Sequence, residues 1–290
     1  MMERTEQAYG KINLSLDVIR KLPSGYHDLR MVMETVALHD DVHITVSEGD
    51  GISMQTNLPF LPSDTRNIAA KAAAFFFEKL ALPKRHVAIR IHKRIPVAAG
   101  MAGGSANAAA VLRGLNTLMD TNLSTPALME LGGELGSDVP YCIIGGTHLA
   151  EGRGEILAPL SPLPPCHIVI CKPKFSISTP ELFSRIDCSK IRHRPDTDGM
   201  IDALQTGSLG QVAIRLFNVF EDVLDGQKRD IQQIKHTLLE TGALGAAMTG
   251  TGPTVFGLFD DKAQASAAYA ALKEHYRETF LTENHSKHLI

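Results

Sequence analysis

The fold of this chain turns on one stretch of sequence, Pro96-Val-Ala-Ala-Gly100-Met-Ala-Gly103-Gly104-Ser105. Alternating apolar residues at 87–91 precede it and an alanine-rich run over residues 106–119 follows it, so the pattern predicts a strand, a glycine loop and a helix. Glycine lets the backbone approach an oxyanion closely, and the free amides and positive dipole at a helix start attract phosphate. A tight packed turn is the alternative interpretation, but we expect an anion-binding loop.

None of the common glycine motifs accounts for this loop. A P-loop needs a lysine before its serine or threonine, whereas Ser105 follows Gly104 directly. The dinucleotide fingerprint needs a glycine where Ala102 stands. A hydrolase elbow needs a glycine where Asn107 stands, although a serine hydrolase built on Ser105 stays open as an alternative.

Composition and charge limit the class of protein. The 290 residues are 44% hydrophobic and 21% charged, which excludes a disordered, collagen-like or coiled-coil chain. The 29 lysines and arginines against 32 acidic residues give a net charge of -3, so the basic footprint of a nucleic-acid binder is missing. No apolar stretch is long enough to span a membrane. An anionic ligand would therefore need a local site.

The termini and cysteines point to a compartment. The amino terminus is polar, with no apolar segment of the kind that a secretory signal carries, so we expect a cytoplasmic protein. The four cysteines lack the C-x-x-C spacing of zinc and redox sites. We interpret them as buried thiols: Cys142, Cys166, Cys171 and Cys188.

Strands and helices are expected to interleave on both sides of the loop. Residues 8–19 alternate between apolar and polar, which predicts a half-buried strand with Lys11 and Asn13 on its polar face. After the turn Pro23-Ser24-Gly25 we expect an irregular stretch and then a strand at 42–46. Further strands are expected at 147–150, 167–171 and on both sides of 250–253, and helices at 67–82 (capped by Ser63 or Asp64), 124–135, from 178 or 179, 198–205, 210–224, 229–241 and from 261.

A proline-rich segment divides the chain. Residues 160–165 hold three prolines, which is typical of a linker. We place the domain boundary there, with one domain over residues 1–160 and another over residues 161–290. Two layers of strands and helices in both halves are typical of an α+β or α/β protein.

Three further elements carry groups suited to phosphate chemistry. Lys11 supplies an ammonium, Asp138 in Gly136-Ser-Asp138-Val-Pro140 supplies a carboxylate, and residues 248–257 form a second glycine loop between apolar runs. Taken singly, each has an ordinary interpretation: a solvated lysine, a helix cap or turn carboxylate, and a hairpin connection.

Taken together, the elements resemble the GHMP kinases, the superfamily of galacto-, homoserine, mevalonate and phosphomevalonate kinases. The resemblance lies in Ala8-Tyr-Gly-Lys11-Ile-Asn13-Leu, in Pro96 to Ala109 and in Thr249 to Phe259. It implies an α+β fold of two domains. The N-terminal domain would be like the second domain of ribosomal protein S5, the C-terminal domain would be ferredoxin-like, and the active site would lie in the cleft between them.

Shorter motifs resemble one branch of this superfamily: Gly25-Tyr26-His27, Gly136-Ser-Asp138-Val-Pro140 and Ser178 to Phe183. The resemblance implies ATP-dependent phosphorylation of the 2-hydroxyl of a methylerythritol that is linked by a diphosphate to cytidine, a step of the non-mevalonate route to isoprenoid precursors. It implies ATP as co-substrate, Mg²⁺, a small-molecule acceptor, and neither a nucleic-acid nor a membrane partner.

The site residues follow from the same resemblance. Lys11 and Asp138 match the catalytic pair, with Asp138 as the base and Lys11 as its charge partner. Asn13, Tyr26, His27 and Phe183 match substrate-binding positions, the last three around the cytosine. The ATP-binding positions are Asn67 and the run Pro96, Val97, Ala98, Ala99, Gly100, Met101, Ala102, Gly103, Gly104, Ser105 and Ala106.

Three residues depart from the superfamily pattern. Ala102 replaces a glycine and Ala106 a common serine, and their methyl groups fit if these positions do not need a positive φ. Arg153 replaces a residue that is more often apolar.

Another GHMP kinase acting on homoserine or mevalonate is the nearest alternative function. A noncatalytic GHMP-like sensor would be expected to lack Lys11 or Asp138.

Overall fold

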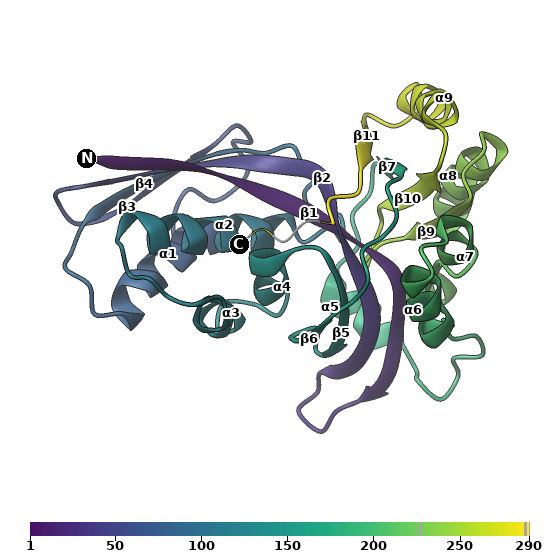
Figure 1. Cartoon of the computed structure of the whole chain (residues 1–290), viewed down its shortest axis with the longest axis horizontal. Helices are drawn as coiled ribbons and strands as arrows, with labels where there is room; N and C mark the ends of the chain where they lie inside the picture. Colours follow the sequence, from purple (N-terminus) through teal and green to yellow (C-terminus); the bar gives the residue numbers. More distant parts are fainter. Residues whose placement is uncertain (225, 227, 287–288, 290) are drawn as a thin grey trace.

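A computed structural model describes residues 1–224, 226, 228–286 and 289 of the chain (Figure 1). The strands are β1 Met2–Lys21, β2 His27–Ser47, β3 Gly51–Thr56, β4 His86–His92, β5 Thr147–Gly152, β6 Ile156–Pro159, β7 His167–Lys172, β8 Phe217–Asn218, β9 Gly245–Met248, β10 Val255–Phe259 and β11 Glu278–Glu283. The helices are α1 Ile68–Lys79, α2 Gly103–Leu118, α3 Thr125–Gly133, α4 Val139–Ile144, α5 Thr179–Arg185, α6 Thr197–Gln205, α7 Leu209–Ala213, α8 Lys228–Glu240 and α9 Lys262–Lys273, and Val219–Val223 form a 3-10 helix.

The strands form two sheets. The first has the order β3-β4-β2-β1-β8, with β5 paired to β2 and β6 to β5. The second has the order β11-β7-β10-β9, in which all neighbours are antiparallel. Figure 1 shows α1 to α4 gathered along the first sheet, on the left, and α6 to α9 beside the second sheet, to the right of the long β1–β2 ribbon. This arrangement confirms the α+β class.

The two sheets share an apolar core. Ile12 and Leu14 of β1 lie in one buried cluster with Ile168 and Ile170 of β7 and Phe256 of β10. Burial of apolar surface stabilises the fold by roughly 25 cal/mol per Å². The polar groups of β1 are therefore held between the two halves of the molecule.

Strand β2 begins much earlier than predicted. We expected an irregular stretch before residue 42, but β2 starts at His27 and pairs with β1 along the whole hairpin. The turn is where the sequence placed it, and Gly25 has a positive φ of 86°. Register shifts next to Lys11 and Asn13 bend the ribbon, and such bulges hide the strict alternation that identifies a strand.

The expected half-buried strand is buried on both faces. Lys11 is 5% exposed, Asn13 and Ser15 are 0% exposed, and Asp17 is 5% exposed. The loops that carry the glycine motifs cover this polar face, as the hydrogen bonds described below show. The interpretation of Lys11 as a solvated surface lysine is therefore wrong.

Several other elements differ from the sequence-based expectation. Helix α1 is capped by Asn67, whose side chain accepts from the Ala69 amide, and not by Ser63 or Asp64. The helix expected over 210–224 is split into α7, β8 and a 3-10 helix, because β8 joins β1 as a parallel edge strand. Strands β3 and β11 were not predicted. Among the cysteines Cys188 is only partly buried, whereas the other three are buried.

The domain boundary at residues 160–165 remains our proposal. Strands β1 to β6 lie in the first sheet, and β7, which begins at residue 167, lies in the second. Strand β8 belongs by sequence to the second half but pairs with β1. The end of the second range, residue 290, lies outside the described residues.

Candidate active site

Three motifs that are far apart in the sequence meet through their backbones. The Lys11 amide donates to the Met101 carbonyl at 3.2 Å. The Asn13 amide donates to the Thr249 hydroxyl at 3.0 Å, and the Gly250 amide donates to the Asn13 side-chain oxygen at 2.9 Å. Strand β1, the glycine loop before α2 and the loop after β9 therefore form one connected structure.

Glycine is required where the two loops touch. Gly100 has a φ of +71°, and a Cβ added there would lie 2.3 Å from the Thr249 carbonyl oxygen. Both the backbone conformation and the close approach exclude a side chain at this position. The loop after β9 thus packs directly on the glycine loop before α2, which is why each of them has a glycine at the contact.

Lys11 is the buried cation of the site. Its ammonium donates to the Asn13 side-chain oxygen at 2.7 Å, and both residues lie on the same face of β1, as predicted. Burial lowers the pKa of Lys11, while the nearby Asp138 carboxylate raises it. An ammonium held in this way, next to a cavity, is suited to offset negative charge that develops during a reaction.

Asp138 lies directly before α4 but does not cap it. Its backbone is helical, and its side chain makes no capping hydrogen bond, so the interpretation as a helix cap is wrong. Asp138 and Lys11 line the same cavity of about 610 Å³. A Cβ on Gly154 would lie 3.9 Å from the Asp138 carboxylate, so the β5–β6 turn approaches it closely.

The glycine loop forms one wall of that cavity. Residues Pro96 to Gly104 line it without a break, whereas Ser105 and Ala106 do not line it. Helix α2 begins at Gly103, three residues earlier than predicted, because the glycines themselves form its first turn. The first amides of a helix have no partner within the helix, and here the first two helical residues, Gly103 and Gly104, line the cavity. The loop therefore has the properties of an anion site.

Ala102 adopts a backbone conformation that is unfavourable for a residue with a Cβ. Its φ is +55° and ψ is 27°, in the left-handed region, whereas Ala106 lies in the first turn of the regular helix. A non-glycine residue is strained there by roughly 1–2 kcal/mol. The condition under which the Ala102 methyl group fits without strain is therefore not met.

Replacing Ala102 by glycine should raise stability. The strain relieved exceeds the backbone entropy that glycine adds to the unfolded chain, so we expect Ala102→Gly to gain about 0.5–1 kcal/mol. The matched variant Ala106→Gly should lose about 1 kcal/mol, because residue 106 is in helical conformation. Thermal unfolding followed by circular dichroism measures both. Equal losses in the two variants would contradict the strained conformation.

The expected base-binding residues line a second pocket, which adjoins the first. His27 and Phe183 have ring centroids 5.0 Å apart, and with Tyr26 they line a pocket of about 580 Å³. Tyr26 is 59% exposed, so much of its surface is accessible to a ligand. Burial, with a smaller effect of Lys21, lowers the pKa of His27, so that its imidazole is neutral at pH 7.

The two asparagines differ in their placement. Asn67 lines the larger cavity at the start of α1, beside the phosphate loop. Asn13 does not line it: its side-chain oxygen accepts from Lys11, Gly250 and Thr249, and its amide donates to the Met31 sulfur. Its contact to substrate stays a prediction, while its position between Lys11 and the loop after β9 is clear.

Sequence reasoning missed Lys93. Its ammonium pairs with the buried Asp40 carboxylate and donates to the Asn107 side-chain oxygen at 2.9 Å, and it lines the cavity. A Cβ on Gly103 would lie 3.3 Å from the Lys93 nitrogen, so the ammonium lies at the start of α2. The one available signal was a lysine between a strand and the glycine loop.

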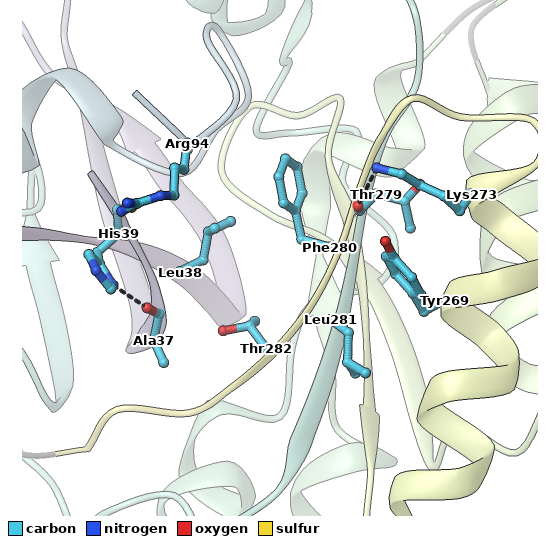
Figure 2. Close-up of a pocket in the computed structure, with 10 residues that line it drawn as sticks. All are labelled: Ala37, Leu38, His39, Arg94, Tyr269, Lys273, Thr279, Phe280, Leu281 and Thr282. Carbon is cyan, nitrogen blue, oxygen red and sulfur yellow. Dashed lines mark hydrogen bonds between the residues drawn. The ribbon is translucent and has the colours of Figure 1, made fainter. Parts of the chain in front are cut away.

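A third cavity lies away from the motifs. It is also about 610 Å³, and Figure 2 shows Leu38 and Arg94 on one side, Lys273 on the other and Phe280 between them. Its cations are already engaged: Arg94 pairs with Asp41 at 2.6 Å, and Lys273 donates to the Thr279 carbonyl at 3.1 Å. None of the expected site residues lines this cavity, so it is not the candidate active site.

Comparisons with known proteins agree with the motifs. The sequence profile of the GHMP kinases N terminal domain matches residues 67–146, and that of the GHMP kinases C terminal domain matches residues 200–278. The chain is 45% identical over 278 residues to the 4-diphosphocytidyl-2-C-methyl-D-erythritol kinase of Lachnoclostridium phytofermentans, covering 95% of each chain. The chain belongs to the 4-diphosphocytidyl-2-C-methyl-D-erythritol kinase family of GHMP kinases.

Other relatives and solved structures support this membership. The kinase of the same description from Clostridium perfringens is 45% identical over 271 residues, with 93% of this chain and 94% of that protein covered. A crystal structure of 4-(cytidine 5'-diphospho)-2C-methyl-D-erythritol kinase superposes with a TM-score of 0.81 at 29% identity, covering 98% and 99% of the two chains. Mevalonate kinase of L. major, at 18% identity and a TM-score of 0.76, shares the fold. As a member of this family, the chain is an ATP-dependent kinase.

Proposed function

We propose that this kinase transfers the γ-phosphate of ATP to the 2-hydroxyl of 4-(cytidine 5'-diphospho)-2-C-methyl-D-erythritol, in the non-mevalonate route to isoprenoid precursors. The observation that carries the proposal is the joining of two pockets. One is lined by Lys11, Asp138 and the glycine loop, the other by Tyr26 and His27, and Phe183 lines both. An acceptor alcohol that carries a nucleotide needs both of these sites: a phosphate site where the transfer takes place and an aromatic pocket for its base.

The reaction depends mainly on alignment and charge. In phosphoryl transfer the transition state spreads charge over the transferred group, so the protein positions the nucleophile and neutralises oxyanions. We propose that the Asp138 carboxylate accepts the proton of the attacking 2-hydroxyl. The Lys11 ammonium is the charge partner of that carboxylate and offsets negative charge as it develops. The Asn13 side-chain oxygen accepts a hydrogen bond from the Lys11 ammonium and so fixes the position of the ammonium next to the cavity.

The phosphates of ATP would lie along the glycine loop. The backbone at the start of α2, where Gly103 and Gly104 line the cavity, and the Lys93 ammonium would bind the phosphates, and Asn67 would reach the adenosine. The helix dipole and the loop amides favour negative charge at this point. A nucleotide in this position would direct its γ-phosphate toward Lys11 and Asp138.

We further propose that the kinase uses Mg²⁺. Among the described residues no cluster of His, Cys, Asp and Glu could hold a metal by itself, and Asp138 is the one carboxylate that lines the cavity. Mg²⁺ is commonly bound by substrate phosphates with few protein ligands, and this donor set fits a metal that arrives with ATP. Bound there, it would neutralise charge on the β- and γ-phosphate oxygens.

Recognition of cytosine has its own physical basis. The neutral His27 imidazole can meet the hydrogen-bonding edge of the base, while Tyr26 and Phe183 can stack on its faces. Each stacked ring contributes roughly 1–3 kcal/mol to binding. Neither homoserine nor mevalonate carries a base that would occupy this aromatic pocket.

The acceptor can be tested directly. ADP release should be measured with the cytidyl methylerythritol, homoserine and mevalonate at equal concentrations, each with ATP and Mg²⁺. We expect turnover with the first and none above background with the others. Turnover of homoserine or mevalonate alone would refute the proposed acceptor, and a serine-directed phosphonate should leave ATP turnover intact.

We propose a cytoplasmic location and small-molecule partners only. All four cysteines are free, which is usual in a reducing compartment. Within the part of the chain that the structure describes, no helix has the length and apolar character needed to cross a membrane. The net charge of -3 argues against a nucleic-acid partner.

A further inference from the structure

Arg153 lies where the two pockets of the candidate site meet. It belongs to the turn between β5 and β6, and it lines both the cavity with Lys11 and Asp138 and the pocket with Tyr26 and His27. Strand β5 pairs with β2 up to the Leu29–Gly152 position, which brings the turn next to the start of β2. No other arginine among the described residues lines either pocket.

The Arg153 guanidinium is only weakly held. It lies over the Tyr26 ring, 5.2 Å from the centroid, and its Nε is 3.3 Å from a Glu155 carboxylate oxygen. The arginine side chain is 47% exposed and that of Glu155 34% exposed, and an exposed pair of this kind contributes little to stability. The guanidinium can therefore exchange Glu155 for another anion at small cost.

The charges around this junction favour an anion. The base pocket is lined by Lys21 and Arg153 and by no carboxylate among the described residues. In the larger cavity Lys93 is already paired with Asp40, and Lys11 is buried beside Asn13. Arg153 is thus the exposed cation located between the base pocket and the reacting groups.

We propose that Arg153 binds the diphosphate of the acceptor and makes this kinase select acceptors that carry one. This inference rests on the proposed function, because a cytosine among Tyr26, His27 and Phe183 and a 2-hydroxyl at Asp138 leave the diphosphate between them. A planar guanidinium donates two parallel hydrogen bonds to phosphate oxygens, which a lysine does not. Stacking on Tyr26 orients the guanidinium and links diphosphate binding to the base pocket.

Binding of a ligand series tests the proposal. Calorimetric titration should compare cytidine and CDP on the unmodified kinase and on Arg153→Met, which keeps an unbranched apolar stem without the guanidinium and its charge. We expect Arg153→Met to weaken CDP binding by about 10- to 100-fold and to change cytidine binding less than about twofold. Arg153→Lys should recover only part of the loss, and the KM for ATP should not change.

Three results would overturn the inference, and a matched variant sharpens it. The first is an equal loss of affinity for cytidine and CDP in Arg153→Met, which would place the effect on Tyr26. The second is a raised KM for ATP. The third is unchanged CDP binding. Glu155→Gln, which removes the competing carboxylate, should tighten CDP binding and leave cytidine binding unchanged. If the unmodified kinase bound neither ligand, the proposed function would fail together with this inference; a CDP affinity that does not depend on Arg153 would remove only the inference.

Discussion

Asp138→Asn should lower kcat by about 10²- to 10⁴-fold while ATP still binds with near-normal affinity. The amide keeps the size of the side chain but cannot accept the proton of the attacking hydroxyl. Asp138 makes no capping hydrogen bond to α4, so the substitution removes no contact that stabilises the helix. The measurement is steady-state ADP release with the cytidyl substrate, with ATP affinity determined separately by titration.

A matched control separates chemistry from charge in general. Asp120→Asn changes an exposed carboxylate in the turn after α2, where an asparagine tolerates the positive φ of 49°. We expect turnover of the control within twofold of the unmodified kinase. A kcat within tenfold of normal for Asp138→Asn would show that alignment alone carries the reaction and would remove the base role from this residue.

Lys11→Met should reduce kcat by about 10²- to 10³-fold without destabilising the protein. The substitution removes the positive charge that offsets the negative charge developing in the transition state. Burying an ammonium costs free energy, and the lowered pKa of Lys11 follows from that burial, so methionine should hold or raise the melting temperature. The Asn13 oxygen keeps its hydrogen bond from the Gly250 amide.

The pH dependence distinguishes the roles proposed for Lys11. Burial lowers the pKa of Lys11, so activity that needs its ammonium should fall as pH rises through that pKa, and Lys11→Met should lack this alkaline limb of the kcat/KM profile. Lys71→Met, on the exposed surface of α1, provides the control and should change neither kcat nor the profile. A lower kcat that tracks a lower melting temperature would mean that Lys11 is only structural.

Much of the site was predictable because its parts are local in sequence. The run Pro96 to Ser105 between a strand and an alanine-rich helix indicated an anion loop, and the two-residue spacing placed Lys11 and Asn13 on one face. In the structure the Lys11 Nζ and Asn13 Oδ1 atoms lie 2.7 Å apart, which confirms that geometry. The roles of individual residues in ATP and substrate binding stay predictions.

Other features were not predictable, for reasons that differ. Lys93 looked like an ordinary lysine because its partner, Asp40, is 53 residues away in the sequence. The helix expected over 210–224 was broken by pairing with a strand near the amino terminus. The positive φ of Ala102 was missed because residue type predicts such backbone only for glycine and asparagine.

Local pattern determined that this chain carries a glycine loop at a helix start, an ammonium and a carboxylate, and in which order along the chain. Tertiary structure alone decided that these groups share one cavity, that both faces of β1 are buried, and that Arg153 lies between two pockets. The reason is physical: hydrophobic periodicity and glycine placement report the conformation of adjacent residues. The contacts among Lys11, Met101 and Thr249 exist only once distant segments have packed together.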